Sequence, residues 1–482
     1  MSLSIVQKIL GLLLMLFSVS MLPPIGVALY FDDGNQAPFV GALIVLLLAG
    51  FATWWPVRHF ERDLRLRDGF LIVALFWVVL SFAGAAPLAL SDRPHLSLTD
   101  AVFEAVSGFT TTGATVLTGL DDLPKSVLYY RQQIQWLGGI GMVVLAVALL
   151  PMLGIGGMQL LKAETPGPVK EAKLTPRIAE TAKALWIVYV AITAACAAGF
   201  WLAGMDVFDA VAHALSTVST GGFSTHDASL AYFDNAGVEI VAIFFMVVGG
   251  VNFSLHFIAW RRWRLRDYLR DPECRAYGLI LGAISLLFVI TLLITHTDDL
   301  GSAMRHGVLQ VVSMMTSTGF VTADFSLWPG ALPVILILCT FIGGCAGSTA
   351  SGMKVIRWML MWKQGSCEIS RLSHPSALLP VKLGDKAVDS RIIDAVWGFF
   401  AIYVVSFAVL MVAFIATGED QVTAFSAIAS CINNTGPGLG DVAHTFITIN
   451  APGKWICILA MLLGRLEVYP LLILLAPSFW RR

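Results

Sequence analysis

Four segments of the chain place a threonine directly before one or two glycines, where a weakly apolar stretch ends. In each segment a serine precedes one glycine by six positions, which selects Gly222 over Gly221 in the second segment. If the four segments surround one axis, backbone carbonyls beside the glycines can converge on it and replace the water around a small cation. The pairs are Ser107 and Gly113, Ser216 and Gly222, Ser313 and Gly319, and Ser430 and Gly436.

The residues next to these glycines supply neutral oxygen atoms and no carboxylate. Neutral oxygens suit a weakly hydrated monovalent cation, whereas a site for a divalent ion would favour a ring of Asp or Glu. Close packing of membrane helices also favours glycine and threonine, but it explains one such segment better than four. The residues predicted to bind the ion are Thr111, Thr112, Gly113, Thr220, Gly221, Gly222, Ser317, Thr318, Gly319, Asn434, Thr435 and Gly436.

The composition predicts that these segments lie in a membrane protein. Apolar residues occupy 57% of the 482 positions, charged residues only 13%, and the mean hydropathy is +0.78, which a soluble domain would not tolerate. Runs long enough to cross a hydrocarbon core of roughly 30 Å predict ten membrane helices. These runs lie near 8–30, 37–57, 69–90, 127–153, 183–204, 234–260, 276–296, 329–362, 394–417 and 452–478.

After two N-terminal helices, the other eight runs pair into four units of helix, short segment and helix. Segments such as 100–109 and 209–218 are too short to span, so their backbone must line an enclosed or water-filled cavity. We predict an all-α integral membrane protein with ten transmembrane helices, eight of which form four pseudo-symmetric helix, pore-loop and helix repeats around one ion pore. The predicted units are the N-terminal helices at 1–60 and repeats at 66–160, 180–265, 275–365 and 390–482.

Most of the 31 basic residues fall on one side of a ten-helix topology. By the positive-inside rule that side is cytoplasmic, and both termini lie on it. The short segments then enter from the outer side, and the negative ends of their helix dipoles point at the membrane centre, where they favour a cation. The sequence contains no basic low-complexity tail of the kind that would predict a nucleic-acid partner. It also contains no phosphate-binding glycine motif, so we predict that this chain does not hydrolyse a nucleotide itself.

The eighth run is interrupted by small residues at 343–352, which predict a broken helix just below the ion site. We predict that this break is a movable gate, with close helix packing as the alternative. Arg465, near the middle of the last run, costs at least about 2.5 kcal/mol to insert and must face the interior. It either blocks the pore and holds the gate through backbone carbonyls, or pairs with Glu467 or Glu104. The residues assigned to gating are Gly343, Gly344, Gly347, Ser348, Thr349, Gly352 and Arg465.

The four glycine segments resemble the pore loops of the Trk/Ktr/HKT potassium transporter superfamily. With the two extra N-terminal helices, the chain resembles the bacterial TrkH-type membrane subunits over nearly its whole length. The segments are Gly108-Phe-Thr-Thr-Thr-Gly-Ala-Thr115, Ser219-Thr-Gly-Gly-Phe-Ser-Thr225, Thr316-Ser-Thr-Gly-Phe320 and Asn433-Asn-Thr-Gly-Pro-Gly438, supported by Gly343-Gly-Cys-Ala-Gly-Ser-Thr349 and Gly464-Arg-Leu-Glu467.

The resemblance implies K+ uptake across the bacterial inner membrane, with K+ as the transported ion at the ion-binding residues and no covalent cofactor. It also implies a homodimer and a cytosolic, nucleotide-binding regulatory ring of the TrkA type. A secondary transporter that couples K+ to H+ or Na+ is the alternative, and Glu104, Asp209 and His213 are its candidate titratable groups. We find no convincing set of catalytic residues at membrane depth, so we predict that the chain is not an enzyme.

Overall fold

The computed structural model describes residues 3–60, 66–148, 174–375, 379–384, 386–475 and 477–480. Parts of the predicted first and last repeats, and several basic residues of the 149–173 region, lie outside the described residues. The described helices are α1 (Leu3–Val19), α2 (Leu22–Phe31), α3 (Gln36–Trp54), α4 (Leu66–Ala83), α5 (Ala85–Leu90), α6 (Leu98–Phe109), α7 (Lys125–Ala148), α10 (Leu174–Leu202), α11 (Val207–Val218), α12 (Ala236–Gly249), α13 (Phe253–Arg262), α14 (Arg266–Arg270), α15 (Pro272–Ile294), α16 (Leu300–Met315), α17 (Leu332–Thr340), α18 (Val355–Ser373), α19 (Ser390–Ile415), α20 (Gln421–Ile432), α21 (Ala451–Arg465), α22 (Tyr469–Leu475) and α23 (Pro477–Trp480).

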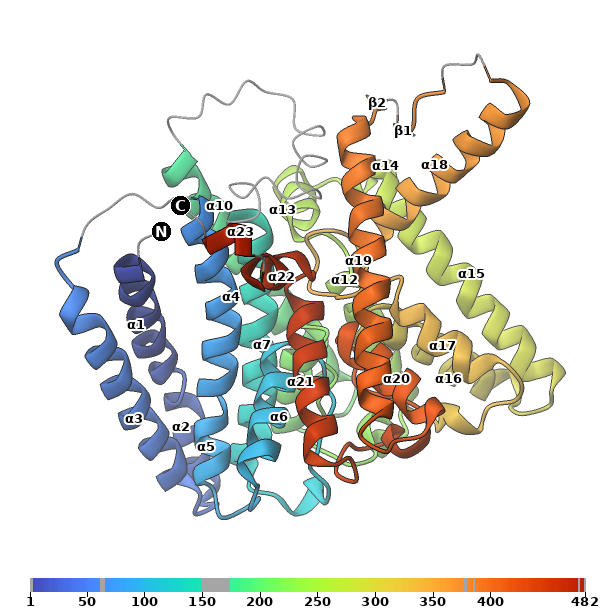
Figure 1. The fold of residues 1–482 in the computed structure, drawn as a ribbon. Helices are drawn as coiled ribbons and strands as arrows, with labels where there is room; N and C mark the ends of the chain where they lie inside the picture. Colours follow the sequence, from blue (N-terminus) through green and yellow to red (C-terminus); the bar gives the residue numbers. More distant parts are fainter. Residues whose placement is uncertain are drawn as a thin grey trace.

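The long helices run roughly side by side, and both termini lie at the same end of the molecule as α14 (Figure 1). The one described sheet is a small antiparallel pair of β1 (Lys382–Leu383) and β2 (Lys386–Ala387), with Lys382 opposite Ala387. It also lies at this end (Figure 1). In the described residues the regular structure is therefore mostly helical, as the apolar runs predict.

Six helical segments among the described residues are long and apolar enough to cross a membrane. A seventh results if α12 and α13, which meet at a bend of 99°, count as one span. The other predicted spans are less regular: α7 carries a polar stretch at 131–135, α17 and α18 are separated at 341–354, and α21 ends after 15 residues. These interruptions concern the helices that pack around the glycine segments.

Each glycine segment follows a short helix, and these helices are α6, α11, α16 and α20. All four begin at a capping residue whose side-chain oxygen accepts a backbone N–H of the first turn, which satisfies donors that the helix itself leaves unpaired. Because of these caps, α6 and α11 begin two residues before the predicted segments at 100 and 209. The caps are Ser97, Asp206, Asp299 and Asp420.

The short helices pack in a cyclic order. α6 packs against α7, α11 against α12, α16 against α17, and α20 against α21. Each also contacts the corresponding long helix of another unit: α11 contacts α7, α16 contacts α12, α20 contacts α17, and α6 contacts α21. The last contact joins the two ends of the chain and closes the cycle. Apolar side chains of α6, α20 and α21 share one buried core with those of α1, α3 and α4.

Candidate functional site

The four short helices end in the same hydrogen-bonded turn. Ser107 O accepts the N–H of Thr112 at 2.8 Å, and the residue between the helix and this threonine, Thr111, is left-handed with φ 55°. This arrangement is a Schellman motif, which satisfies a free carbonyl at the end of a helix. It explains the six-residue spacing, because the serine carbonyl closes the turn and the glycine follows directly. The other turns join Ser216 to Gly221, Ser313 to Thr318 and Ser430 to Thr435 at 2.8–2.9 Å, with Thr220, Ser317 and Asn434 left-handed.

The four glycines predicted from the spacing meet in one cycle. Each has positive φ, between 79° and 96°, which strains any residue with a Cβ atom. Each also lies against the carbonyl oxygen that directly precedes the next glycine in the cycle. A Cβ atom would lie 2.2 Å from Gly221 O at Gly113, 1.8 Å from Thr318 O at Gly222, 1.9 Å from Thr435 O at Gly319 and 2.8 Å from Thr112 O at Gly436.

We call residues 111–113, 220–222, 317–319 and 434–436 the ion-site loops. All the predicted ion-binding residues lie in them, and the structure brings all four loops together. Thr112, Thr220, Thr318 and Asn434 are fully buried. A cavity of about 340 Å³ is lined by all four glycines. Within the described residues, no group of three or more His, Cys, Asp or Glu side chains could hold a metal ion.

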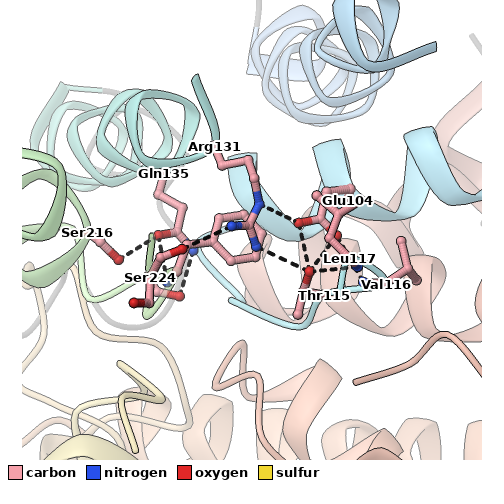
Figure 2. Close-up of polar contacts among 10 residues, drawn as sticks. Glu104, Thr115, Val116, Leu117, Arg131, Gln135, Ser216 and Ser224 are labelled. Atoms are coloured by element: carbon pink, nitrogen blue, oxygen red, sulfur yellow. Dashed lines mark hydrogen bonds and ion pairs between the residues drawn. The ribbon is translucent and has the colours of Figure 1, made fainter. Parts of the chain in front are cut away.

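A buried arginine on α7 joins the chain just beyond the first ion-site loop to the chain just beyond the second, as Figure 2 shows. Arg131 Nε donates to Glu104 Oε1 at 2.8 Å, and its Nη1 donates to the carbonyl of Ser224 at 3.0 Å. Glu104 also accepts from the hydroxyl of Thr115 and the N–H of Val116, both at 3.0 Å. The ion pair therefore fixes the chain just beyond Gly113 and just beyond Gly222.

Gln135 lies one helical turn beyond Arg131 and holds the second loop directly (Figure 2). Its amide nitrogen donates to Gly221 O at 2.6 Å. Its amide oxygen accepts from the Ser216 hydroxyl at 2.7 Å and from the Phe223 N–H at 3.1 Å. One side chain thus satisfies groups on both sides of the loop and orients one of the carbonyls that meet a glycine.

We expect Glu104→Ala to lower the free energy of unfolding by about 3–5 kcal/mol, because it leaves Arg131 buried without its charged partner. Thermal unfolding in detergent micelles measures this loss. Glu368→Ala is the control: its ion pair with Arg371 is half exposed, and its removal costs about 0–1 kcal/mol. Equal losses in the two variants would contradict the structural role of the buried pair.

The three titratable residues considered for coupled transport, Glu104, Asp209 and His213, all have partners in the structure. Glu104 pairs with Arg131, and Asp209 Oδ1 accepts from the Thr225 hydroxyl at 2.7 Å. His213 Nδ1 lies 2.9 Å from the carbonyl of Asp209, and its Nε2 lies 3.0 Å from the Ser224 hydroxyl. These contacts position the ion-site loops.

His226 lines the same cavity as the glycines and joins two units of the chain. Its Nε2 lies 3.1 Å from Asp209 Oδ2, its Nδ1 pairs with Asp121, and its ring stacks on Tyr232 with centroids 3.5 Å apart. Burial alone would lower the pKa of His226, but the hydrogen bonds with Asp209 and Asp121 and their negative charges outweigh it and raise the pKa above 6.5. The fold therefore favours the imidazolium.

This raised pKa predicts how stability depends on pH. The stabilisation from His226 should be complete below about pH 6.5 and should be lost as the pH rises through the raised pKa. We expect the melting temperature of the unmodified chain to exceed that of His226→Gln at about pH 6, with a gap that shrinks by about pH 9. A gap that stays constant across this range would count against the charged histidine.

The predicted broken helix is present, since α17 ends at Thr340 and α18 begins at Val355. We call residues 341–354, which include the segment predicted to gate the pore, the gate loop. Thr349 donates its hydroxyl to Val218 O, the last residue of α11, at 3.0 Å, and Ser351 N donates to the Ser317 hydroxyl at 2.7 Å. Ser348 closes a turn within the loop by donating to Cys345 O at 2.6 Å. The gate loop therefore contacts two of the units that form the ion-site loops.

The glycines assigned to the gate are needed for its compact path. Gly343, Gly347 and Gly352 have φ of 73–78°, and a Cβ on Gly343 would lie 2.1 Å from Ser351 O. A Cβ on Gly344 would lie 2.8 Å from Gly250 O. The loop folds back on itself and against α12, so the small residues serve its packing as well as its turns.

Arg465 is buried at the end of α21 and binds the gate loop. Its Nη1 donates to Thr349 O and to the Ser351 hydroxyl, and its Nη2 donates to the carbonyl of Gly138, all at 3.1 Å. The guanidinium also lies 5.2 Å from the ring centroid of Trp77. Of the two interactions expected from the sequence, the one with the gate loop is present.

The alternative prediction, an ion pair of Arg465 with Glu467 or Glu104, is wrong for the described part of the chain. Glu467 pairs with Arg357, and Glu104 pairs with Arg131. Glu467 lies beyond the end of α21 in a left-handed turn, with φ 51°, which removes it from the helix that carries Arg465. Both acids are thus already neutralised by other arginines.

Arg131 and Gln135 are functional candidates that the sequence interpretation missed. Their signal is the polar run of α7 within an otherwise apolar stretch, since intramembrane polar groups are costly and must find partners. Their partners, Glu104 and Gly221, lie 27 and 86 positions away in the chain. A run of polar residues indicates a buried network but does not identify its members.

The chain matches the family model described as "TrkH: Cation transport protein" over residues 35–482. Two similar proteins are named Trk system potassium uptake protein TrkH. The one from Halomonas elongata is 52% identical over 100% of both chains, and the one from Escherichia coli K12 is 50% identical over 99% of both. The crystal structure of the potassium transporter TrkH from Vibrio parahaemolyticus has 50% identity and a TM-score of 0.93, and covers 100% of both chains.

The fold and the sequence therefore agree on one assignment. The chain is a multi-pass membrane transport protein, and the prediction that it is not an enzyme is confirmed by the family match. With a family model that covers most of its length and relatives that match it from end to end, the chain belongs to the TrkH cation transport family.

Proposed function

We propose that this chain lets K+ enter across the bacterial inner membrane through a pore in which the ion-site loops choose the ion. The observation that carries the proposal is the closed cycle in which each glycine lies against the carbonyl before the next glycine. The names of the relatives, which refer to potassium uptake, support K+ as the transported ion. No further cofactor is needed for this role.

The proposed architecture has ten transmembrane helices, with four pseudo-symmetric repeats around the pore and two N-terminal helices beside them. The cyclic packing of α6, α11, α16 and α20 supports this arrangement, as does the identical turn at the end of each. The four proposed pore repeats are residues 66–160, 180–265, 275–365 and 390–482. Basic residues concentrated at one end support cytoplasmic termini.

The neutral ligands of the ion-site loops support a monovalent cation as the transported ion. The ion-site loops contain hydroxyl, amide and carbonyl oxygens and no carboxylate. The short helices also end at these loops, so their negative dipole ends add to the attraction for a cation. A ligand set of this kind replaces the hydration shell of K+ at lower cost than that of a divalent ion.

We propose that the gate loop and Arg465 control passage through the pore. The loop bonds to Val218 and Ser317, next to two ion-site loops, and Arg465 bonds to Thr349 and Ser351 of the gate loop. The buried guanidinium of Arg465, below the ion site, both repels a cation and holds the gate loop in place. Opening requires the loop to leave the pore axis and Arg465 to exchange these partners.

We propose a homodimer that is controlled by a cytosolic, nucleotide-binding ring of the TrkA type. Six arginines between positions 261 and 275 give α13, α14 and the start of α15 a strongly basic, exposed surface, which suits an acidic protein partner. The names of the relatives place them in a Trk system, which supports a separate regulatory subunit.

The contacts of the titratable groups favour a gated pore over coupled transport of K+ with H+ or Na+. Glu104, Asp209 and His213 are all held in hydrogen bonds that position the ion-site loops. A coupling site needs a group that changes its charge during each transport cycle. The partners of these three residues would have to be rearranged each time.

Growth of a bacterial strain that lacks its own K+ uptake systems tests the proposed function. We expect expression of this chain with its regulatory subunit to restore growth at low external K+. When Gly222 is substituted by alanine in the same strain, Gly278→Ala is the matched control, because a Cβ there meets nothing within 4 Å. Failure of the unmodified chain to restore growth, although it reaches the membrane, would contradict K+ uptake.

A further inference from the structure

The gate loop is bonded to the bend between α12 and α13. Cys345 N donates to Gly250 O at 2.8 Å, and Phe253 N donates to Gly347 O at 3.1 Å. A further backbone bond joins Thr349 N to the carbonyl of Gly249 at 3.3 Å. The bend therefore provides backbone partners for the middle of the gate loop, and α13 continues from it toward the basic end of the molecule.

A second connection reaches the gate loop from α15. Glu273 Oε1 accepts the N–H of Ala346 at 2.7 Å and the N–H of Ile356 at 3.2 Å. Ile356 lies in the first turn of α18, whose capping position, Lys354, offers no side-chain cap. Glu273 thus satisfies a free N–H of α18 and holds it close to the gate loop.

The two connections alternate along the gate loop. Cys345 and Gly347 bond to the α12–α13 bend, and Ala346, between them, bonds to Glu273. We call residues 250–273 the connecting segment. It runs from the bend through α13 and α14 to Glu273, and its two ends together are bonded to three successive residues of the loop.

The connecting segment also carries most of the proposed partner surface. Arg261, Arg262 and Arg264 are exposed, and so is Trp263, at 87% of its full exposure. α13 and α14 lie at the end of the molecule that holds both termini (Figure 1). A partner that binds here would touch residues 8 to 12 positions along the chain from Phe253 and from Glu273, which both bond to the gate loop.

We infer that Glu273 is a positioning residue for the gate, through which the connecting segment sets the position of the gate loop. This inference rests on the proposed function. When the segment moves, Gly250, Phe253 and Glu273 move with it, and the bonded loop must follow or lose these bonds. With Glu273 in place, the loop stays against the bend and the pore is closed in the absence of a partner.

The test compares Glu273→Ala, Glu273→Gln and Glu368→Ala in the full chain, reconstituted without a cytosolic partner. Glutamine keeps an oxygen that can accept both N–H bonds, whereas alanine keeps none. Glu368 lies on α18, pairs with the half-exposed Arg371 and is the control for loss of an acid. Rb+ flux into liposomes and the K+ to Na+ preference are measured together with hydrogen exchange at Ala346 and Ile356.

We expect Glu273→Ala to raise basal flux by about tenfold, equivalent to roughly 1.4 kcal/mol in the opening equilibrium. The ion preference should stay unchanged, and both amides should exchange faster. Glu273→Gln should return the flux to within about twofold of the unmodified chain, a rescue that general destabilisation would not produce.

Unchanged flux in Glu273→Ala, or an equal rise in the alanine and glutamine variants, would overturn the inference. If the alanine variant does not fold, the glutamine variant decides: slow exchange at both amides and near-normal flux support the role, and fast exchange or high flux overturns it. If the unmodified chain carries no K+ or Rb+ even when its cytosolic partner is present, the proposed function fails. In that case exchange at Ala346 still decides whether Glu273 holds the loop.

Discussion

Arg465→Ala is expected to raise the basal K+ flux of the reconstituted chain by about 10- to 100-fold. The guanidinium makes three hydrogen bonds, two of them to the gate loop, and bonds from a charged donor are worth roughly 1.5–3 kcal/mol each. Loss of even one or two shifts the opening equilibrium by this factor. The substitution also removes a buried positive charge from the contacts between α7, α21 and the gate loop. Rb+ flux into liposomes measures the change.

Arg465→Lys separates the two contributions of the side chain. Lysine keeps the charge but loses the planar fork of donors that reaches Thr349, Ser351 and Gly138 together. We expect its flux to lie between those of the unmodified chain and Arg465→Ala. Thermal unfolding of each variant controls for loss of fold, and flux that is unchanged in Arg465→Ala would contradict a role in closing the pore.

The second large effect is expected at the glycine cycle. Gly222→Ala should lower K+ uptake by at least about tenfold, because the new methyl would lie 1.8 Å from Thr318 O and the residue would keep φ near 79°. Overpacking and strain at such a position each cost about 1–3 kcal/mol. The loops must shift apart to admit the methyl group, and the carbonyls leave their positions. Uptake of K+ by cells at low external K+ measures the loss.

Two glycines provide matched controls for this prediction. Gly119 has φ 68° but a Cβ there meets nothing within 4 Å, so Gly119→Ala tests strain without collision. Gly436→Ala should be milder than Gly222→Ala, since its methyl would lie 2.8 Å from the nearest carbonyl. If Gly119→Ala and Gly222→Ala were equally harmful, the collision at the cycle would not be the cause.

The spacing of serine and glycine predicted the cycle because the interaction is local. The serine carbonyl and the N–H that it accepts lie five positions apart, so a six-residue pattern reports the turn directly. The broken helix at 343–352 was predictable for a similar reason, since small residues within a span change the local backbone. Helix starts were less certain, because Asp206 and the other caps lie outside the apolar pattern.

The partners of the charged residues could not be predicted in the same way. Arg131 finds Glu104 on a neighbouring helix, and Arg357 finds Glu467, 110 positions away. Many pairings of the available acids and bases satisfy the requirement that buried charges be neutralised. Only the packing of α6 against α7, and of α18 against the chain beyond α21, selects among them. The sequence therefore predicted that Arg465 binds carbonyls of the gate loop, but not which loop residues accept its bonds and not the bond to Gly138.

The most direct test of the proposed function is the reversal potential of the chain, purified together with its regulatory subunit, in a planar bilayer or in liposomes. With unequal K+ on the two sides, equal pH, and Na+ in place of K+ on one side in a second experiment, the proposed pore predicts two results. Current should reverse near the K+ equilibrium potential, with no accompanying H+ movement, and it should weaken when Na+ is the only cation. Absence of a K+ current, or K+ movement that requires H+ or Na+ in fixed proportion, would contradict the account.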